Sequence, residues 1–231
     1  SALSNKLNEI YLAAIRNSDT MEEEVGAFAK HYEHTSLFLE TLFRRDHFLK
    51  GTYVLRKQPC NFRTEVIAPL VERYLPSFKK KGIAFNNSLD DVPDDEITLY
   101  VDKGLISQVF DNLFSNALKY TTAVEDQPGN QIKLVSCSRQ ILKDAFAAGV
   151  DGVRFNFFTT GRPLPESEAR RLFDEGYRAA SAELERGTGH GLHFVRNVVE
   201  IHGGLVGCEP QQYGNLIYFI LPMKHHMPVA S

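Results

Sequence analysis

The 231-residue sequence contains no tryptophan and only three cysteines, which are Cys60, Cys137 and Cys208. An odd number of cysteines argues against a disulfide framework, and their wide separation does not match the spacing of a metal site. Sparse, unpaired cysteine is typical of proteins that fold in a reducing compartment, so we expect a cytoplasmic location.

The sequence also lacks a strong charge of either sign and any long apolar run. Its formal net charge is −3, which offers no basic surface to a nucleic acid. No apolar run approaches the roughly 20 residues that cross a bilayer, and no signal peptide opens the chain. Since the chain begins inside a helical pattern, we keep open a role as the cytoplasmic part of a membrane-bound sensor. The share of hydrophobic residues, 43%, is that of a globular protein with one or two domains.

The N-terminal part of the chain is expected to be helical. Segment 1–17 carries apolar residues near one helical face, and segment 21–50 is a longer amphipathic helix that Gly51 can end. Two such helices joined by a short loop form an antiparallel hairpin. A lone hairpin cannot bury its apolar stripe, so residues 1–55 are predicted to form a homodimer through a four-helix bundle.

Residues 56–231 mix helical and strand periods, which makes the whole chain α+β. The expected helices are 64–81, 105–122, 166–176 and 190–204. The expected strands are 82–87, 96–102, 131–137, 153–158, 204–209 and 215–221. We therefore expect an α/β sandwich, with one mixed sheet, helices on one face and the last two strands paired as a hairpin. Pro76 is expected to kink or divide its helix.

One polar cluster stands out on the helix expected at 105–122. Asn112 and Asn116 are four residues apart and share a helical face, which Lys119 and Tyr120 extend. Amide oxygens suit Mg²⁺ and lysine suits phosphate, although a merely solvated polar face is the alternative for each residue.

A second element favours the phosphate reading. The segment GTGHGL, residues 187–192, places three glycines directly before a helix. Glycine allows backbone to approach a phosphate closely, and a helix N-terminus favours an anion.

These motifs resemble those of the ATP-binding domain of sensor histidine kinases, in the same order along the chain. NLFSNALKY, residues 112–120, resembles the N box, and RLFDEGYR, residues 171–178, resembles the F box. GTGHGL with a helix ending in HGG resembles the G2 box, and YGNLIYFILP, residues 213–222, resembles the final strand. That family shares an α/β sandwich with DNA gyrase and some heat-shock chaperones. By the same resemblance, the helical hairpin looks like a dimerisation and histidine-phosphotransfer unit.

The resemblance implies ATP and Mg²⁺ as ligands and gives roles to individual residues. Asn116 would ligate Mg²⁺, while Asn112 would support the metal or the phosphates. Lys119 and Tyr120 would contact phosphate and ribose, and Arg178 would reach the γ-phosphate or the phosphotransfer site. Residues 179–186 would form a lid in which Arg186 is a further cation. The other implied nucleotide-binding positions are Thr159, Gly161, Phe173, Gly187, Thr188, Gly189, His190, Gly191, Leu192 and Asn215.

The sequence departs from the family pattern at three places. In the G1 box, usually D-x-G-x-G, Thr159 replaces the acid that reads the adenine amino group and Pro163 replaces the second glycine. A neutral hydroxyl in place of a carboxylate costs about 1–3 kcal/mol of nucleotide affinity. Asn215 replaces the usual threonine of the final strand, and Asn5 stands where the phosphoacceptor histidine is expected.

These observations leave more than one function open. The first is a histidine kinase that phosphorylates a histidine and passes the phosphoryl group to the receiver domain of a response regulator. The second is a pseudokinase or phosphotransfer adaptor that has lost the use of ATP and acts through protein contacts. A related anti-sigma serine/threonine kinase is a weaker alternative, because such kinases lack a long N-terminal hairpin.

Overall fold

The computed structural model describes residues 54–88, 99–179 and 189–223. The chain divides into two units, Ser1–Val54 and Leu55–Ser231, and the fold below is that of the second unit. The predicted helical hairpin, its homodimer and Asn5 lie outside the described residues, so they remain predictions. Within the described ranges, no helix is both long and apolar enough to cross a membrane.

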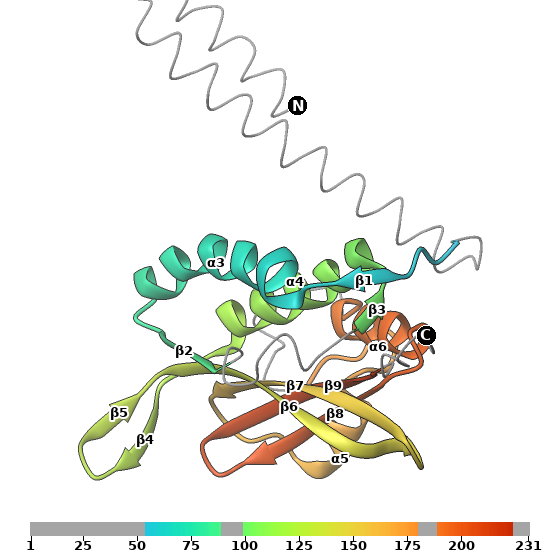
Figure 1. The fold of residues 1–231 in the computed structure, drawn as a ribbon. Helices are drawn as coiled ribbons and strands as arrows, with labels where there is room; N and C mark the ends of the chain where they lie inside the picture. The colour runs from blue at the N-terminus through green and yellow to red at the C-terminus, as the bar shows by residue number, and fades with distance from the viewer. Residues whose placement is uncertain (1–53, 89–98, 180–188, 224–231) are drawn as a thin grey trace, which may run out of the picture. The chain divides into compact units, whose positions relative to one another are not determined.

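The centre of the unit is a five-stranded sheet in the order β2-β6-β7-β9-β8 (Figure 1). Its strands are β2 (Ala84–Ser88), β6 (Leu134–Ala147), β7 (Val150–Thr160), β8 (Leu205–Gln211) and β9 (Gly214–Pro222). The β2–β6 pair is parallel and the other pairs are antiparallel, which confirms the expected mixed sheet. The predicted hairpin of the last two strands is also confirmed.

Two short strand pairs lie outside this sheet. They are formed by β1 (Gln58–Cys60) with β3 (Leu99–Val101), and by β4 (Val124–Gln127) with β5 (Asn130–Ile132). The strand predicted over 131–137 was wrong as a single element, since β5 ends at Ile132 and turns back on β4 while Leu134 begins β6. Strands as short as β1 and β4 carry too little apolar alternation to be recognised in a sequence.

The helices are α3 (Ala68–Lys80), α4 (Lys103–Tyr120), α5 (Glu166–Arg171) and α6 (Gly191–Ile201), with a π-helical turn at Arg63–Ile67. Figure 1 shows α3, α4 and α6 along one face of the sheet. The sequence predicted that Pro76 would kink or divide the helix expected at 64–81. The predicted division was wrong, because α3 continues through Pro76 to Lys80. Pro69 lies in the first turn of α3, where its missing N–H is tolerated.

The core lies between the sheet and α4 and is built from phenylalanine. Phe155 and Phe157 of β7 and Phe219 of β9 all contact the ring of Phe110 at centroid distances of 5.3–5.5 Å. All four side chains are at most 2% exposed. The packing fixes α4 on the sheet, so polar residues on the sides of α4 are held in defined directions.

The opposite face of the sheet carries polar and charged side chains among apolar ones. Arg154 follows the strand alternation and lies on this face, where its guanidinium stacks on the Tyr218 ring at 3.8 Å and pairs with Glu209 at 2.9 Å. Apolar and polar residues alternate from Val153 to Phe157 of β7, which explains why this strand could be recognised in the sequence.

A buried histidine joins the end of α6 to the start of α4. His202 is 4% exposed. Its Nδ1 donates to the Val198 carbonyl at 2.7 Å and its Nε2 accepts from the Asp102 backbone N–H at 2.9 Å. Asp102 also caps α4 by accepting from the Leu105 N–H at 3.2 Å. This arrangement needs a neutral imidazole, because a proton on Nε2 would face another donor.

We therefore expect His202 to make stability depend on pH. Burial, assisted by the charge of Lys57, holds the pKa of His202 below its ordinary value of 6.5. As the pH falls below about 6.5, the unfolded chain binds this proton before the folded chain does, so the unfolding free energy decreases. Urea unfolding at pH 7.5 and 5.5 should show a smaller pH difference in His202→Gln than in the wild type. An equal pH difference in both proteins would assign the effect to other groups.

Candidate functional site

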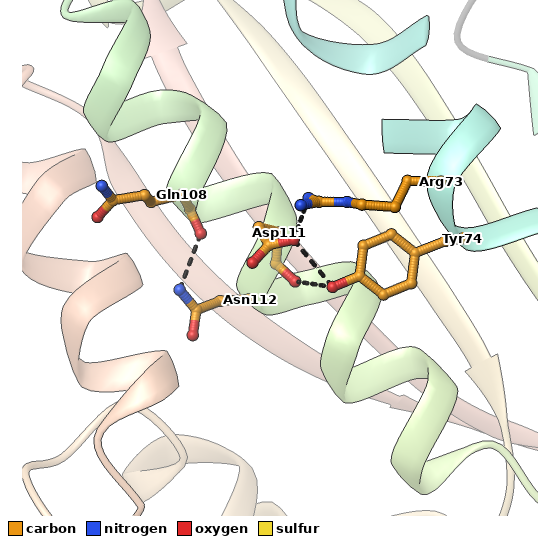
Figure 2. A network of polar contacts seen from close by, with 5 residues as sticks. All are labelled: Arg73, Tyr74, Gln108, Asp111 and Asn112. Atoms are coloured by element: carbon orange, nitrogen blue, oxygen red, sulfur yellow. Dashed lines mark hydrogen bonds and ion pairs between the residues drawn. The ribbon is translucent and has the colours of Figure 1, made fainter. Parts of the chain in front are cut away.

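A stripe of amide side chains runs along one side of α4. Gln108, Asn112 and Asn116 are spaced by four residues and therefore share a face, and each is half-buried. The Nδ2 of Asn112 donates to the Gln108 carbonyl at 2.8 Å (Figure 2). Because this bond uses the nitrogen, the Oδ1 of Asn112 is left as the outward acceptor.

The rotation of α4 about its axis is held from the other side by α3. Arg73 forms an ion pair with Asp111, and the Tyr74 hydroxyl donates to Asp111 Oδ1 at 2.8 Å. Burial, with the nearby charge of Asp111, raises the pKa of Tyr74, so its hydroxyl stays a donor. Figure 2 shows these contacts on one side of α4 and Gln108 and Asn112 on the other. The network thus directs the amide stripe away from α3.

The amide stripe meets the N-terminus of α6. A Cβ on Gly191 would lie 2.9 Å from Asn112 Oδ1, so glycine is what permits this approach. His190 is the N-cap residue of α6, and its carbonyl accepts from the Phe194 N–H at 2.9 Å. The first N–H groups of a helix have no partners within it and carry partial positive charge. Hard oxygen ligands and an anion-binding helix end therefore adjoin here.

The F-box segment is attached to the same helix. The His193 ring contacts the Phe173 carbonyl at 3.3 Å, and Arg196 pairs with Asp174 at 3.2 Å. Gly189 has φ +71°, and a Cβ there would lie 2.7 Å from the Gly176 carbonyl oxygen. Both its backbone conformation and its packing require glycine. Phe173 is 4% exposed, so its ring anchors this segment in the core.

Where β7 ends and β9 begins, two positions that depart from the family pattern lie opposite each other. Thr159 of β7 is the direct cross-strand partner of Asn215 of β9. The Asn215 amide accepts from the Leu164 N–H at 2.8 Å and donates to the Arg162 carbonyl at 3.0 Å. Asn215 therefore fixes the loop around Pro163 in place and uses both ends of its amide to do so.

The same end of β7 is tied to the C-terminus of α4. The Thr160 hydroxyl accepts from the Leu134 N–H at 3.0 Å and donates to the Thr122 carbonyl at 2.8 Å. A Cβ on Gly161 would lie 3.1 Å from the Thr122 hydroxyl and 3.6 Å from the Tyr120 carbonyl oxygen. The substituted G1 segment is therefore in direct contact with the residues that follow α4.

The structure places two pairs of the positions predicted from sequence next to each other. Asn112 meets Gly191, and Thr159 meets Asn215. The half-buried positions are Asn112, Asn116, Tyr120, Thr159, Arg178, Gly189, His190, Gly191, Leu192 and Asn215, whereas Gly161 and Phe173 are buried and Lys119 is exposed. Gly187 and Thr188, like Arg186, fall outside the described residues, so their roles remain predictions.

Sequence reasoning missed two contributors to this arrangement. Gln108 positions Asn112 through its backbone carbonyl, and the Gln108 Oε1 atom is buried without a hydrogen-bond partner in the described residues. Asp111 sets the orientation of α4 by its contacts with α3. Gln108 could have been found from its spacing, since it lies four residues before Asn112, but the partners of Asp111 are remote in sequence.

The donor set fits a metal-bound phosphate better than a metal held by the protein alone. In the described part of the chain, no group of three histidine, cysteine, aspartate or glutamate residues could hold a metal ion. A hard cation at Asn112 and Asn116 would take amide oxygens and complete its shell with oxygens of an anion or water. The N-terminus of α6 beside Asn112 suits that anion.

Comparison with known proteins agrees with this geometry. The model of the histidine kinase-, DNA gyrase B- and HSP90-like ATPase family matches residues 101–225. The adaptive-response sensory kinase SasA of Crocosphaera subtropica is 27% identical over 220 residues, which are 92% of this chain and 53% of that protein. The chain thus spans about half the length of this relative.

Two solved structures show the same fold at low identity. Full-length ShkA in complex with AMPPNP has a TM-score of 0.58 and 22% identity, covering 88% of this chain and 39% of that chain. The histidine kinase ThkA in complex with the response regulator TrrA has a TM-score of 0.53 and 17% identity, covering 96% of this chain and 59% of that chain. With the family model spanning more than half of its residues, the chain belongs to the histidine kinase-, DNA gyrase B- and HSP90-like ATPases, as the ATPase domain of a sensor histidine kinase.

Proposed function

We propose that this chain is the kinase core of a two-component sensor that binds Mg–ATP. It transfers the γ-phosphoryl group to a histidine, from which the group passes to an aspartate of a response-regulator receiver domain. In the first step the bond from the γ-phosphorus to the β-phosphate oxygen breaks, a bond to an imidazole nitrogen forms, and ADP leaves.

The observation that carries this proposal is the approach of Asn112 Oδ1 to Gly191 at the start of α6. It supports a site in which the amide stripe of α4 and the N–H groups of α6 hold one triphosphate from two sides. When bound, Mg²⁺ would neutralise phosphate charge, and Asn116, supported by Asn112, would hold it. Lys119 and Tyr120, at the end of α4, would contact phosphate and ribose.

The position of the phosphoacceptor is the weakest match to this function. Asn5 has an amide in place of a nucleophilic imidazole nitrogen, so the chain as it stands lacks an acceptor at that position. We propose that the hairpin is a homodimerisation unit and that Asn5→His supplies an acceptor. Transfer of ³²P from labelled ATP to Asn5→His, in a form that is labile to acid, is the expected result.

Calorimetric titration with a non-hydrolysable ATP analogue is the primary test of the nucleotide site. We expect binding in the micromolar range that requires Mg²⁺. Absence of binding at millimolar nucleotide would refute the kinase proposal. A chain that fails this test but still binds a receiver domain would instead be a phosphotransfer adaptor.

The adaptor is the second candidate because the residues at the base end of the site depart from the family pattern. The base end is the part around Thr159 and Asn215, where the resemblance implies that adenine binds. Thr159 and Pro163 have replaced expected G1 residues, and Asn215 is engaged with the G1 loop backbone. These features support a fold kept for protein contacts. Autophosphorylation of Asn5→His by ATP would exclude this alternative, because it requires a working nucleotide site.

Gly191→Ala should separate nucleotide affinity from folding stability. An alanine Cβ would lie 2.9 Å from Asn112 Oδ1 and would displace this amide. The backbone of Gly191 has no positive φ, so alanine fits it and should stabilise the fold by about 0.4–1 kcal/mol through the unfolded state. We therefore expect about a tenfold loss of nucleotide affinity, measured by calorimetry, with an unchanged or higher melting temperature.

A double-mutant cycle provides the control for this prediction. If Gly191 acts through Asn112, the affinity losses of Gly191→Ala and Asn112→Ala will not add in the double variant. Additive losses would show that alanine at 191 obstructs the nucleotide directly.

A further inference from the structure

Thr159 is a polar side chain at the end of the proposed site that is expected to hold the base. Thr159 lies two residues beyond the buried Phe157 on β7, so it faces the helix-covered side of the sheet and is half-buried. Within the described residues, the Thr159 hydroxyl has no hydrogen-bond partner. Its cross-strand partner Asn215 is already engaged with the G1 loop, because its amide oxygen accepts from the Leu164 N–H and its amide nitrogen donates to the Arg162 carbonyl.

The hydrogen-bonding character of this side chain decides which bases it accepts. An ionised carboxylate only accepts hydrogen bonds, whereas a hydroxyl donates one and accepts others. A carboxylate at position 159 would pair with the amino group of adenine and repel the carbonyl oxygen of guanine. The Thr159 hydroxyl can rotate to accept from the amino group or to donate to the carbonyl oxygen.

The fixed loop beside Thr159 strengthens this point. Asn215 holds the backbone on both sides of Pro163 at 2.8 and 3.0 Å, and Thr160 ties the end of β7 to Thr122 at 2.8 Å. These contacts hold the loop in one position beside Thr159. Discrimination between purines then depends on the hydroxyl at position 159.

We infer that the Thr159 hydroxyl makes this site tolerant of the purine base, so that it takes guanosine and adenosine triphosphates with similar affinity. The inference rests on the proposed function, since it requires a nucleotide whose base lies at Thr159. It goes beyond that function by naming a wider class of phosphoryl donor.

The test is calorimetric titration of the 231-residue chain with non-hydrolysable ATP and GTP analogues in the presence of Mg²⁺. The wild type should bind the two analogues with affinities within about fivefold of each other. Thr159→Asp should prefer the ATP analogue by about 100-fold or more, because the acid and the guanine oxygen are both acceptors. Its isostere Thr159→Asn keeps a donor and an acceptor and should remain tolerant.

Thr159→Val completes the set, because it removes the hydroxyl at nearly constant volume. We expect this variant to lose about tenfold in affinity for both analogues while keeping their ratio near one. Thermal unfolding checks that each variant is folded. If Thr159→Asp does not fold, the wild type, Thr159→Asn and Thr159→Val still decide the question.

The outcomes separate this inference from the proposed function. A wild-type preference for the ATP analogue above about 50-fold, or equal selectivity in Thr159→Asp and Thr159→Asn, overturns the inference. Binding of magnesium tripolyphosphate without binding of either analogue also overturns it but leaves a working phosphate site. Failure to bind tripolyphosphate and both analogues refutes the proposed function itself.

Discussion

Replacing Asn116 with alanine is expected to lower the magnesium-dependent affinity for ATP by about 100-fold. Asn116 is half-buried on the same face of α4 as Asn112, which lies against the start of α6. Loss of its amide oxygen would leave the cation without its proposed protein ligand. The measurement is calorimetric titration with an ATP analogue, carried out with and without Mg²⁺.

The matched control for this prediction is Asn86→Ala. Asn86 is exposed on β2, so removal of its amide should leave nucleotide affinity unchanged. An equal loss of affinity in Asn116→Ala with and without Mg²⁺ would assign Asn116 to the nucleotide and remove its role as a metal ligand. The melting temperatures of both variants should stay close to that of the wild type.

Replacing Phe110 with alanine is expected to lower the free energy of unfolding by about 3–5 kcal/mol. The Phe110 ring is 0% exposed. It contacts Phe62, Phe155 and Phe219, with centroid distances between 5.3 and 6.0 Å. A cavity at this point removes the contacts of α4 with the sheet and with Phe62, and the surrounding rings cannot collapse into it fully. Urea unfolding, followed by circular dichroism, measures the loss.

Phe158→Ala is the control for the core prediction. Phe158 lies on β7 next to the buried Phe157 but is half-buried on the opposite face, so its removal should cost only about 1 kcal/mol. Similar losses in the two variants would show that the core does not depend on the α4–sheet contact. Since Phe110 also fixes α4, its loss should weaken nucleotide binding as well.

The extent to which the site was predictable differs between its two ends. At the phosphate end, the motifs of α4 and α6 were recognisable because their glycine and asparagine residues lie within single helices or at helix ends. At the base end, the sequence showed that Thr159 and Asn215 depart from the family pattern, but it did not show which contacts these residues make. That Asn215 uses its amide on the G1 loop depends on a loop whose residues lie far from it in the sequence.

The helices and most strands were determined by the sequence itself, because apolar residues in α4, α6 and β7 repeat with the period of the element that contains them. The β8–β9 hairpin was also local, since its two strands are joined by a short turn. By contrast, the break between β5 and β6 was decided by pairing with β4 and with β7, which local periodicity does not record.

Only the tertiary structure decided which polar groups meet. The rotation of α4, set by Asp111 contacts with α3, directs Asn112 to Gly191. The β7–β9 register places Thr159 opposite Asn215. Both results depend on packing and strand pairing between segments distant in sequence. Residue types therefore determined what chemistry this chain can carry, whereas long-range contacts determined which of those residues act together.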